Sequence, residues 1–138
     1  MPATLIRASD GDLVNVQEGE SCNIVATFKD LNGNAIVKAS LITLTMTLAL
    51  ESTSAAINGR GPTPQNVLDA NGGTVASDGT LTLRLQPADN SIIGTPLDGT
   101  IEVHVIEFEW TWNDGVAVRT GHSGPLGIYI ENRATIVA

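Results

Sequence analysis

The feature that most constrains this chain is a strict alternation of side chains between Leu41 and Leu50, where the sequence reads LITLTMTLAL. Successive side chains of a β-strand point to opposite faces, so a period of two places the apolar residues on one face and the threonines on the other. Threonine, being β-branched, also favours a pleated strand. This segment is therefore predicted to be a half-buried strand whose core face carries Ile42, Leu44, Met46 and Leu48.

Two further segments repeat the pattern. In 80–86 the core face carries Leu81, Leu83 and Leu85. In 103–112 the apolar face consists of His104, Ile106, Phe108, Trp110 and Trp112. Glu107 and Glu109 lie on the opposite face of that segment and are predicted to be solvated. Shorter candidate strands are 22–28, 116–120 and 126–131. An inter-sheet core is expected to form from Ile42, Leu44, Met46, Leu48, Leu81, Leu83, Leu85, Ile106 and Phe108.

The connections are marked by glycine after asparagine or aspartate, which tolerate the positive φ of hairpin turns. Such pairs occur at 32–33, 58–59, 71–72, 78–79, 98–99 and 114–115. No window has a helical period, and a single helical turn is expected at 87–90. Short strands with regular turns and no intervening helices predict an all-β antiparallel sandwich that forms one domain over residues 1–138.

The amino-acid composition of the chain argues against several classes of function. Seven Lys and Arg residues against fifteen Asp and Glu give a formal net charge of −8. Nucleic acid is not expected as a partner, because a phosphate backbone requires clustered basic residues and these are scattered. The single cysteine, Cys22, excludes an internal disulfide. No apolar run matches a signal peptide or membrane span, so we expect an unexported, soluble protein made in the cytoplasm.

The side chains capable of catalysis are few. His104 is interpreted as a core or edge histidine. The segment Gly121-His122-Ser123-Gly124-Pro125 differs from a nucleophile elbow in its spacing and has no following helix. Glu107 and Glu109 share one strand face, whereas glycosidase carboxylates flank a substrate from different elements. We therefore expect a protein that is not an enzyme and has no cofactor.

Two acidic segments and two tryptophans were considered as binding sites. The turn from Asp30 to Asn34 does not match an EF-hand loop and is interpreted as a hairpin. Asp10, Asp12, Glu18 and Glu20 surround the first expected strand and leave a calcium site as an open hypothesis. Trp110 and Trp112 continue an apolar face, so they are expected to complete the core and not to stack on a sugar.

Several short segments resemble small Ig-like β-sandwich proteins of tailed bacteriophage virions. They are 27–36, 56–60, 65–68, 81–90 and Phe108-Glu-Trp-Thr-Trp112. The resemblance implies a virion structural protein, first of all a capsid decoration or cement protein that binds the major capsid protein or other virion subunits. A head-tail connector, neck or baseplate component is the alternative, and a carbohydrate-binding module is a third. The resemblance also leaves open a homo-oligomer.

Two segments are the expected partner contacts. They are an N-terminal arm over residues 1–9 and a long irregular connection over 52–73. The connection carries Gly59, Gly61, Pro62 and Pro64 among a few isolated apolar residues. Such segments can gain order by packing on a partner. The candidate partner-binding residues are Leu5, Ile6, Ile57, Arg60, Val67 and Leu68. The alternative is that both segments fold back on their own domain, the arm as an edge strand and the connection as a flap.

Overall fold

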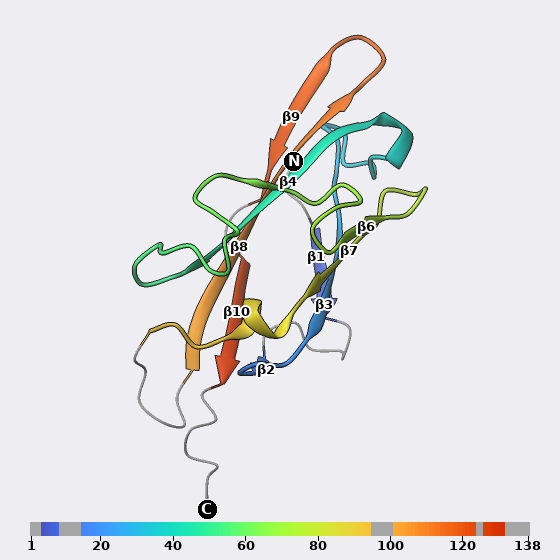
Figure 1. Cartoon of the computed structure of the whole chain (residues 1–138). Helices are drawn as coiled ribbons and strands as arrows, with labels where there is room; N and C mark the ends of the chain where they lie inside the picture. Colours follow the sequence, from blue (N-terminus) through green and yellow to red (C-terminus); the bar gives the residue numbers. More distant parts are fainter. Residues whose placement is uncertain (1–3, 9–14, 95–100, 124–125, 132–138) are drawn as a thin grey trace, which may run out of the picture.

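The computed structural model describes residues 4–8, 15–94, 101–123 and 126–131, and within them the chain forms two β-sheets packed face to face (Figure 1). One sheet has four strands in the order β1-β3-β7-β6, and the other has six. The strands of the first sheet are β1 (Thr4–Ala8), β3 (Cys22–Thr27), β6 (Gly73–Val75) and β7 (Leu81–Leu85). The strands of the second are β2 (Asn15–Gln17), β4 (Leu41–Leu50), β5 (Gln65–Asn66), β8 (Ile101–Asn113), β9 (Val118–His122) and β10 (Leu126–Glu131).

The six-stranded sheet is built around β8, which has 13 residues. Along one edge β8 pairs with β4 over almost its whole length. Along its other edge β8 pairs first with β10 and then with β9, so these two strands lie end to end on the same side. The short strand β2 pairs with the outer edge of β10, and this pair is parallel. The prediction of an all-β sandwich is confirmed, while this parallel pair was not predicted.

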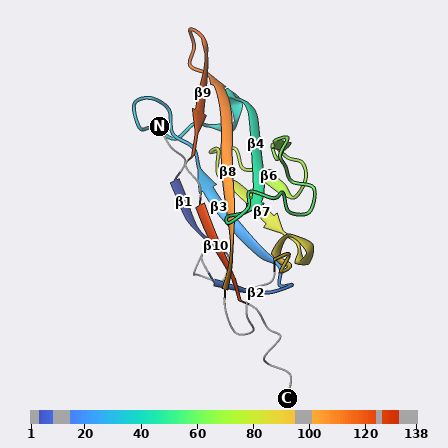
Figure 2. The ribbon, with the colours of Figure 1, turned by 90° about the vertical axis from the view of Figure 1, so that its left-hand side faces the viewer.

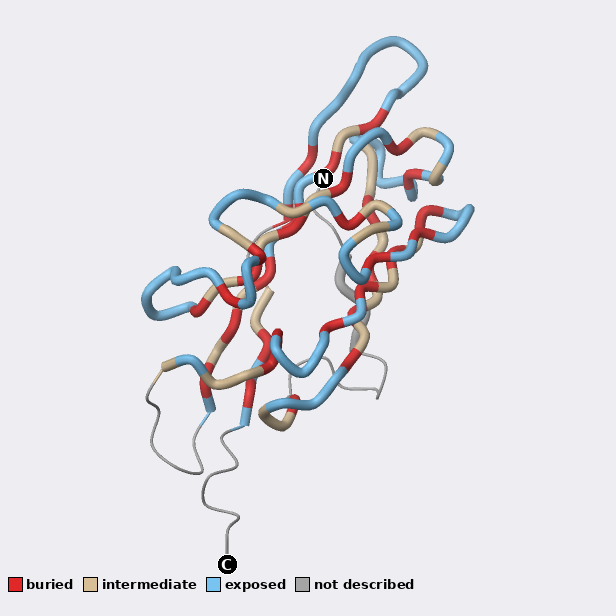
Figure 3. Tube along the Cα trace, viewed as in Figure 1, coloured by how far each residue is buried: buried red, intermediate tan, exposed pale blue. Residues whose placement is uncertain are grey.

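The core lies between the sheets and contains most of the predicted residues. Leu44, Met46 and Leu48 of β4 face the three leucines of β7, and Ile106 and Phe108 of β8 lie beside them. All eight are buried (Figure 3). The Phe28 ring contacts Phe108 edge-on at a centroid distance of 5.5 Å and Trp110 at 4.9 Å. Both Trp110 and Trp112 are buried, so the prediction that they complete the core is confirmed.

Ile42 departs from the predicted core. Its side chain is 45% exposed, whereas that of Leu41 is buried. The register of β4 against β8 shifts between Leu41 and Thr43, and such an irregularity moves a residue from one face to the other. The prediction for Ile42 is therefore wrong, because the alternation that begins at Leu44 does not extend through the start of the strand.

The turns follow the predicted glycine positions wherever these are described. Asn58-Gly59 has φ values of 51° and 70°, and Asn71-Gly72 has 52° and 91°. In each case the N–H of the next residue, Arg60 or Gly73, donates to the carbonyl three residues earlier. Two positive φ values in sequence are the type I′ geometry that asparagine followed by glycine favours. The pair at 98–99 lies outside the described residues.

Two 3-10 turns occur in the described part of the chain, η1 (Lys38–Ser40) and η2 (Pro87–Asn90). The second is the helical turn predicted from sequence. In its capping box the Asp89 carboxylate accepts a hydrogen bond from the Gln86 N–H at 2.7 Å. Across the described ranges, no helix has the length and apolar character needed to span a membrane.

We predict that Leu83→Ala lowers the free energy of unfolding by about 2–5 kcal/mol, because the fully buried side chain leaves a cavity between the sheets. Ile42→Ala is the matched control and should change it by less than about 0.5 kcal/mol, since this side chain is exposed. Urea denaturation of both variants measures the difference. Equal losses would show that the assignment of the two faces is wrong.

Candidate functional site

Three predicted partner-binding residues in the long connection are buried inside the domain. Ile57, Arg60 and Val67 all have exposed fractions of 5% or less, and Leu68 is partly buried against the core. The connection also returns to β4, because β5 pairs with it and Ala56 forms a bridge to Ala49. The prediction that Ile57, Arg60 and Val67 contact a partner is therefore wrong, and the alternative of a flap that folds back is correct.

Arg60 is buried because its guanidinium group finds acceptors on several elements. Its Nε lies 2.7 Å from Asp89 Oδ1 and its Nη2 lies 3.2 Å from Oδ2, so the ion pair is bidentate. Nη1 donates to Gln65 Oε1 at 2.7 Å and to the Asn71 carbonyl at 3.0 Å. Asn58 Nδ2 also donates to Asp89 Oδ1, at 2.9 Å. A charge is tolerated in the interior when its hydrogen bonds are satisfied in this way.

The N-terminal arm also contributes to the fold. Its residues 4–8 form β1, which pairs antiparallel with β3 at the edge of the four-stranded sheet. This matches the alternative of an edge strand. Leu5 and Ile6 lie on this strand, and their side chains are outside the described residues.

The candidate catalytic side chains of the sequence lie on or beside β8 and β9. Ser123 is buried, and its Oγ accepts a hydrogen bond from the Phe108 N–H at 2.8 Å. His122 is exposed and its Nδ1 lies 3.4 Å from Glu109 Oε2, on the outer face of the sheet where Glu107 is also exposed. The prediction of a solvated face for Glu107 and Glu109 is confirmed.

His104 is a core histidine that contacts an acid. It is fully buried, with Nε2 2.7 Å from Glu102 Oε1, while Nδ1 has no hydrogen-bond partner within the described part of the chain. Burial raises the pKa of Glu102, but hydrogen bonds from the Ile93 N–H, His104 and the Gly94 N–H outweigh it and hold that pKa below its ordinary value. These bonds hold the segment after η2 against the start of β8. Sequence reasoning placed His104 in the core but gave no role to Glu102.

The acidic segments form turns where they are described. Asp30 Oδ1 accepts hydrogen bonds from the N–H groups of Asn32 and Asn34, both at 2.9 Å, and Lys29 bridges to Ala35. The predicted hairpin is thus confirmed. For the calcium hypothesis, Asp10 and Asp12 lie outside the described residues, while Glu20 Oε1 accepts from the Gln17 N–H.

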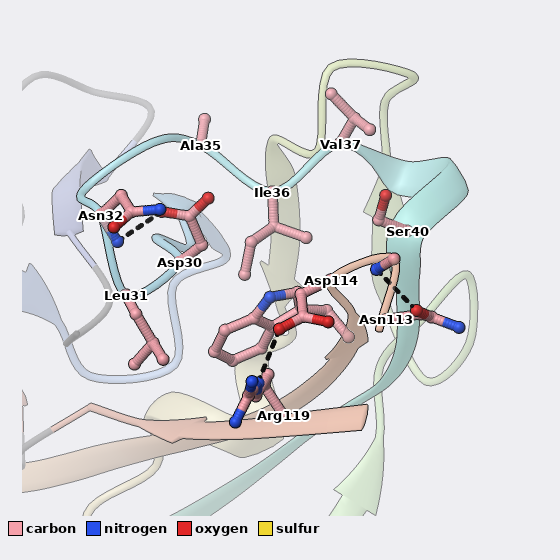
Figure 4. A pocket seen from close by; sticks show the side chains of 12 residues that line it. Asp30, Leu31, Asn32, Ala35, Ile36, Val37, Ser40, Asn113, Asp114 and Arg119 are labelled. Atoms are coloured by element: carbon pink, nitrogen blue, oxygen red, sulfur yellow. Dashed lines mark hydrogen bonds and ion pairs between the residues drawn. The ribbon is translucent and has the colours of Figure 1, made fainter. Parts of the chain in front are cut away.

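The β8–β9 hairpin extends outward at one end of the sandwich (Figure 2). The connection between β3 and β4 reaches the same end and, with the hairpin, encloses an open hollow of about 650 Å³ (Figure 4). Leu31, Val37 and Trp112 contribute apolar lining, and Ser40 and Arg119 contribute polar lining. We call this region the hairpin end.

Several exposed apolar residues lie on the elements that form the hairpin end, and they were not predicted as a group. Val116 at the tip is 90% exposed and Leu31 is 60% exposed. Val37, Ile42 and Val118 are also exposed. Contiguous exposed apolar side chains surrounded by polar groups are typical of protein-binding surfaces. The turn signal Asn113-Asp114-Gly115 predicted the hairpin, but only the three-dimensional arrangement places Leu31 and Val37 beside it.

The charged groups of the hairpin end are already paired. Asp114 Oδ1 accepts hydrogen bonds from the N–H groups of Val116 and Ala117 at 2.8 Å, and Oδ2 lies 2.6 Å from Arg119 Nε. The Ala117 N–H, Arg119 and the Val116 N–H together lower the pKa of Asp114 to about 2. The turn is therefore held in one conformation by its own side chains.

We predict that Arg60→Ala lowers the free energy of unfolding by about 3–5 kcal/mol, because Asp89 is left as an unpaired buried charge. Arg84→Ala is the control, since Arg84 is an exposed arginine on β7. Chemical denaturation of both variants measures the difference. If Arg60→Ala is as stable as Arg84→Ala, the connection is not held by this ion pair.

We predict that the Asp114 carboxyl titrates at about 2 in the native protein and that its pKa rises in Arg119→Gln. The pKa of Asp114 in the folded protein lies below the ordinary aspartate pKa, so the ionised carboxylate stabilises the folded state at pH values above that ordinary pKa. This stabilisation is lost as the pH falls through about 2. Carbon-detected NMR titration measures this pKa. An Asp114 pKa of about 4 in the native protein would contradict the turn geometry.

Comparison with known proteins gives no family for this chain. No family model and no curated protein sequence matches it. Among solved structures, the chain is similar to MtrC from Shewanella baltica OS185, with 16% sequence identity and a TM-score of 0.43. That alignment covers 94% of this chain and 23% of the MtrC chain, so this chain spans about a quarter of its length. None of these comparisons bears on the predicted virion role, which stays a prediction.

Proposed function

We propose that this chain is a non-enzymatic assembly module whose hairpin end binds another protein. The observation that carries the proposal is that the exposed Leu31 and Val37 line the hollow and that Val116 and Val118 are exposed on the adjoining hairpin, on a fold whose other large apolar residues are mostly buried. A surface of this kind loses contact with water when a partner covers it, and that burial favours association. The paired charges of Asp114 and Arg119 fix the shape of the hairpin before binding.

The charge-bearing residues that line the hollow support binding over catalysis. Asp30 and Asp114 accept hydrogen bonds from backbone N–H groups of their own turns, and Arg119 pairs with Asp114. A general base or nucleophile must have a reactive atom directed at the substrate. The groups that line this hollow are instead engaged in holding the two loops.

The most specific form of the proposal is a virion structural protein, and it rests on the sequence resemblance to small β-sandwich proteins of tailed phages. In that form the partner is the major capsid protein, and the chain decorates or cements the capsid lattice. A position at the neck or baseplate would use the same hairpin end with another virion subunit. Copy number in purified particles separates the two, because a lattice protein is present in far more copies than a neck or tail-tip protein.

We predict that Leu31→Asp with Val116→Asp reduces incorporation into purified particles at least about tenfold, which corresponds to a loss of about 1.4 kcal/mol in binding. The control is Ile101→Asp, because Ile101 is also exposed but lies beside the Glu102 end of β8. Both variants should melt within a few degrees of the native protein. Quantitative mass spectrometry of particles measures incorporation, and normal incorporation of the hairpin-end variant would contradict the proposal.

A further inference from the structure

Among the described strands, none pairs with the outer edge of β9, so this edge presents backbone N–H and C=O groups. Two backbone hydrogen bonds at the ends of the β8–β9 pair show which positions bond across it. The Asp114 N–H donates to the Ala117 carbonyl, and the Ser123 N–H donates to the Phe108 carbonyl. In an antiparallel pair, hydrogen-bonded positions alternate with positions whose backbone groups point away. With this register the N–H and C=O groups of Val118, Thr120 and His122 point outward from the sheet.

This free edge continues an edge that already accepts a strand within the domain. β9 and β10 lie end to end on the same side of β8, and β2 pairs with the outer edge of β10. The domain thus covers the outer edge of β10 with an extended segment of its own, and no described strand pairs with the outer edge of β9.

β9 has neither the proline nor the internal register shift that commonly protects an edge strand, although it carries the charged Arg119. It has five residues. By comparison, the edge strands β5 and β6 have two and three residues. β9 is also held firmly, since a Cβ on Gly121 would lie 2.6 Å from the Trp110 ring. The glycine therefore lets β9 pack directly on the core.

The charges around β9 indicate the kind of segment that fits. Glu107, Glu109 and Asp114 lie on β8 and the hairpin turn. β9 itself carries Arg119, which pairs with Asp114, and His122, whose Nδ1 lies 3.4 Å from Glu109 Oε2. The whole chain has a net charge of −8. A second copy would bring the same charges to the edge and be repelled, whereas a basic segment would be attracted.

We propose that the outer edge of β9 binds an extended, positively charged segment of a partner protein, which adds a strand to the six-stranded sheet. Main-chain hydrogen bonds to Val118, Thr120 and His122 supply affinity, and the acidic surroundings supply the preference for lysine or arginine. The inference rests on the proposed function only in taking the hairpin end as the partner-binding end. It adds the mode of binding and the chemistry of the partner.

The test uses the full-length chain and the probe peptide acetyl-Lys-Val-Lys-Val-Lys-Val-Lys-amide, followed by NMR and amide hydrogen exchange. We expect the outward N–H groups of Val118, Thr120 and His122 to exchange at least about tenfold more slowly with the peptide. The N–H groups of Arg119 and Gly121, already bonded to β8, should change little. The effect should weaken as salt is raised. An acetyl-Glu-Val-Glu-Val-Glu-Val-Glu-amide peptide should give no slowing.

Two variants separate edge binding from binding nearby. Thr120→Pro removes one outward N–H without removing a ladder bond and should abolish the slowing, whereas Thr120→Ala keeps the N–H and should retain it. Should Thr120→Pro fail to fold, the alternation of slowed and unchanged amides in the native protein still decides the question. No slowing, slowing without alternation, an equal response to the acidic peptide, or a native dimer joined through β9 would each overturn the proposal.

The outcomes also distinguish this inference from the proposed function. If the Leu31 and Val116 variant fails to enter particles but the peptide does not bind β9, the assembly role stands and strand addition is wrong. If the peptide binds β9 but the variant enters particles normally, strand addition stands and the proposed role of the apolar surface is wrong.

Discussion

The buried ion pair between Arg60 and Asp89 is the interaction on which the arrangement of the connections depends. Between β4 of the six-stranded sheet and β6 of the four-stranded sheet, the chain forms one short strand, the two-residue β5, which pairs back with β4. Arg60 holds this segment to η2, with Asn58, Gln65 and the Asn71 carbonyl completing the network. Next to Asp89, Asn90 is also buried and donates to the Glu20 carbonyl at 2.6 Å, before β3. The consecutive residues Asp89 and Asn90 thus link η2 both to the long connection and to the segment before β3.

The residues that hold the long connection in place and the residues proposed to bind a partner lie in different parts of the molecule. The long connection, which contains the glycines and prolines typical of a mobile loop, is fixed in the interior by charge and hydrogen bonding. The exposed apolar residues instead occur at the hairpin end, where β8 is long enough to pair with β10 and then with β9. The additional length of β8 therefore produces both the hollow beside the hairpin and the unpaired edge of β9.

Much of the fold follows from local pattern, because alternation, threonine content and glycine turns are properties of short segments. The bounds of β4 and β10 match those predicted, and the hairpin at Asp114 follows from its turn residues. Ile42 was assigned to the wrong face because a register shift depends on the partner strand. β2 was missed because three residues carry no period and its pairing with β10 joins parts of the chain far apart. Arg60 was assigned to a partner because its acceptor, Asp89, lies 29 positions away in sequence. The hairpin end escaped prediction for the same reason, since Leu31 and the turn residues Asn113 to Gly115 line one hollow only in the folded chain.

A double-mutant cycle on Arg60→Met and Asp89→Leu tests most directly whether the buried pair holds the connection in place. Each single variant leaves one buried charge unpaired, so each should lose about 3–5 kcal/mol of unfolding free energy, whereas the double variant removes both charges and should lose much less than the sum. Amide exchange over residues 57–73 should rise in both single variants. If the two losses simply add, or if exchange in that segment does not change, Arg60 and Asp89 act independently and the connection is held by its apolar contacts alone.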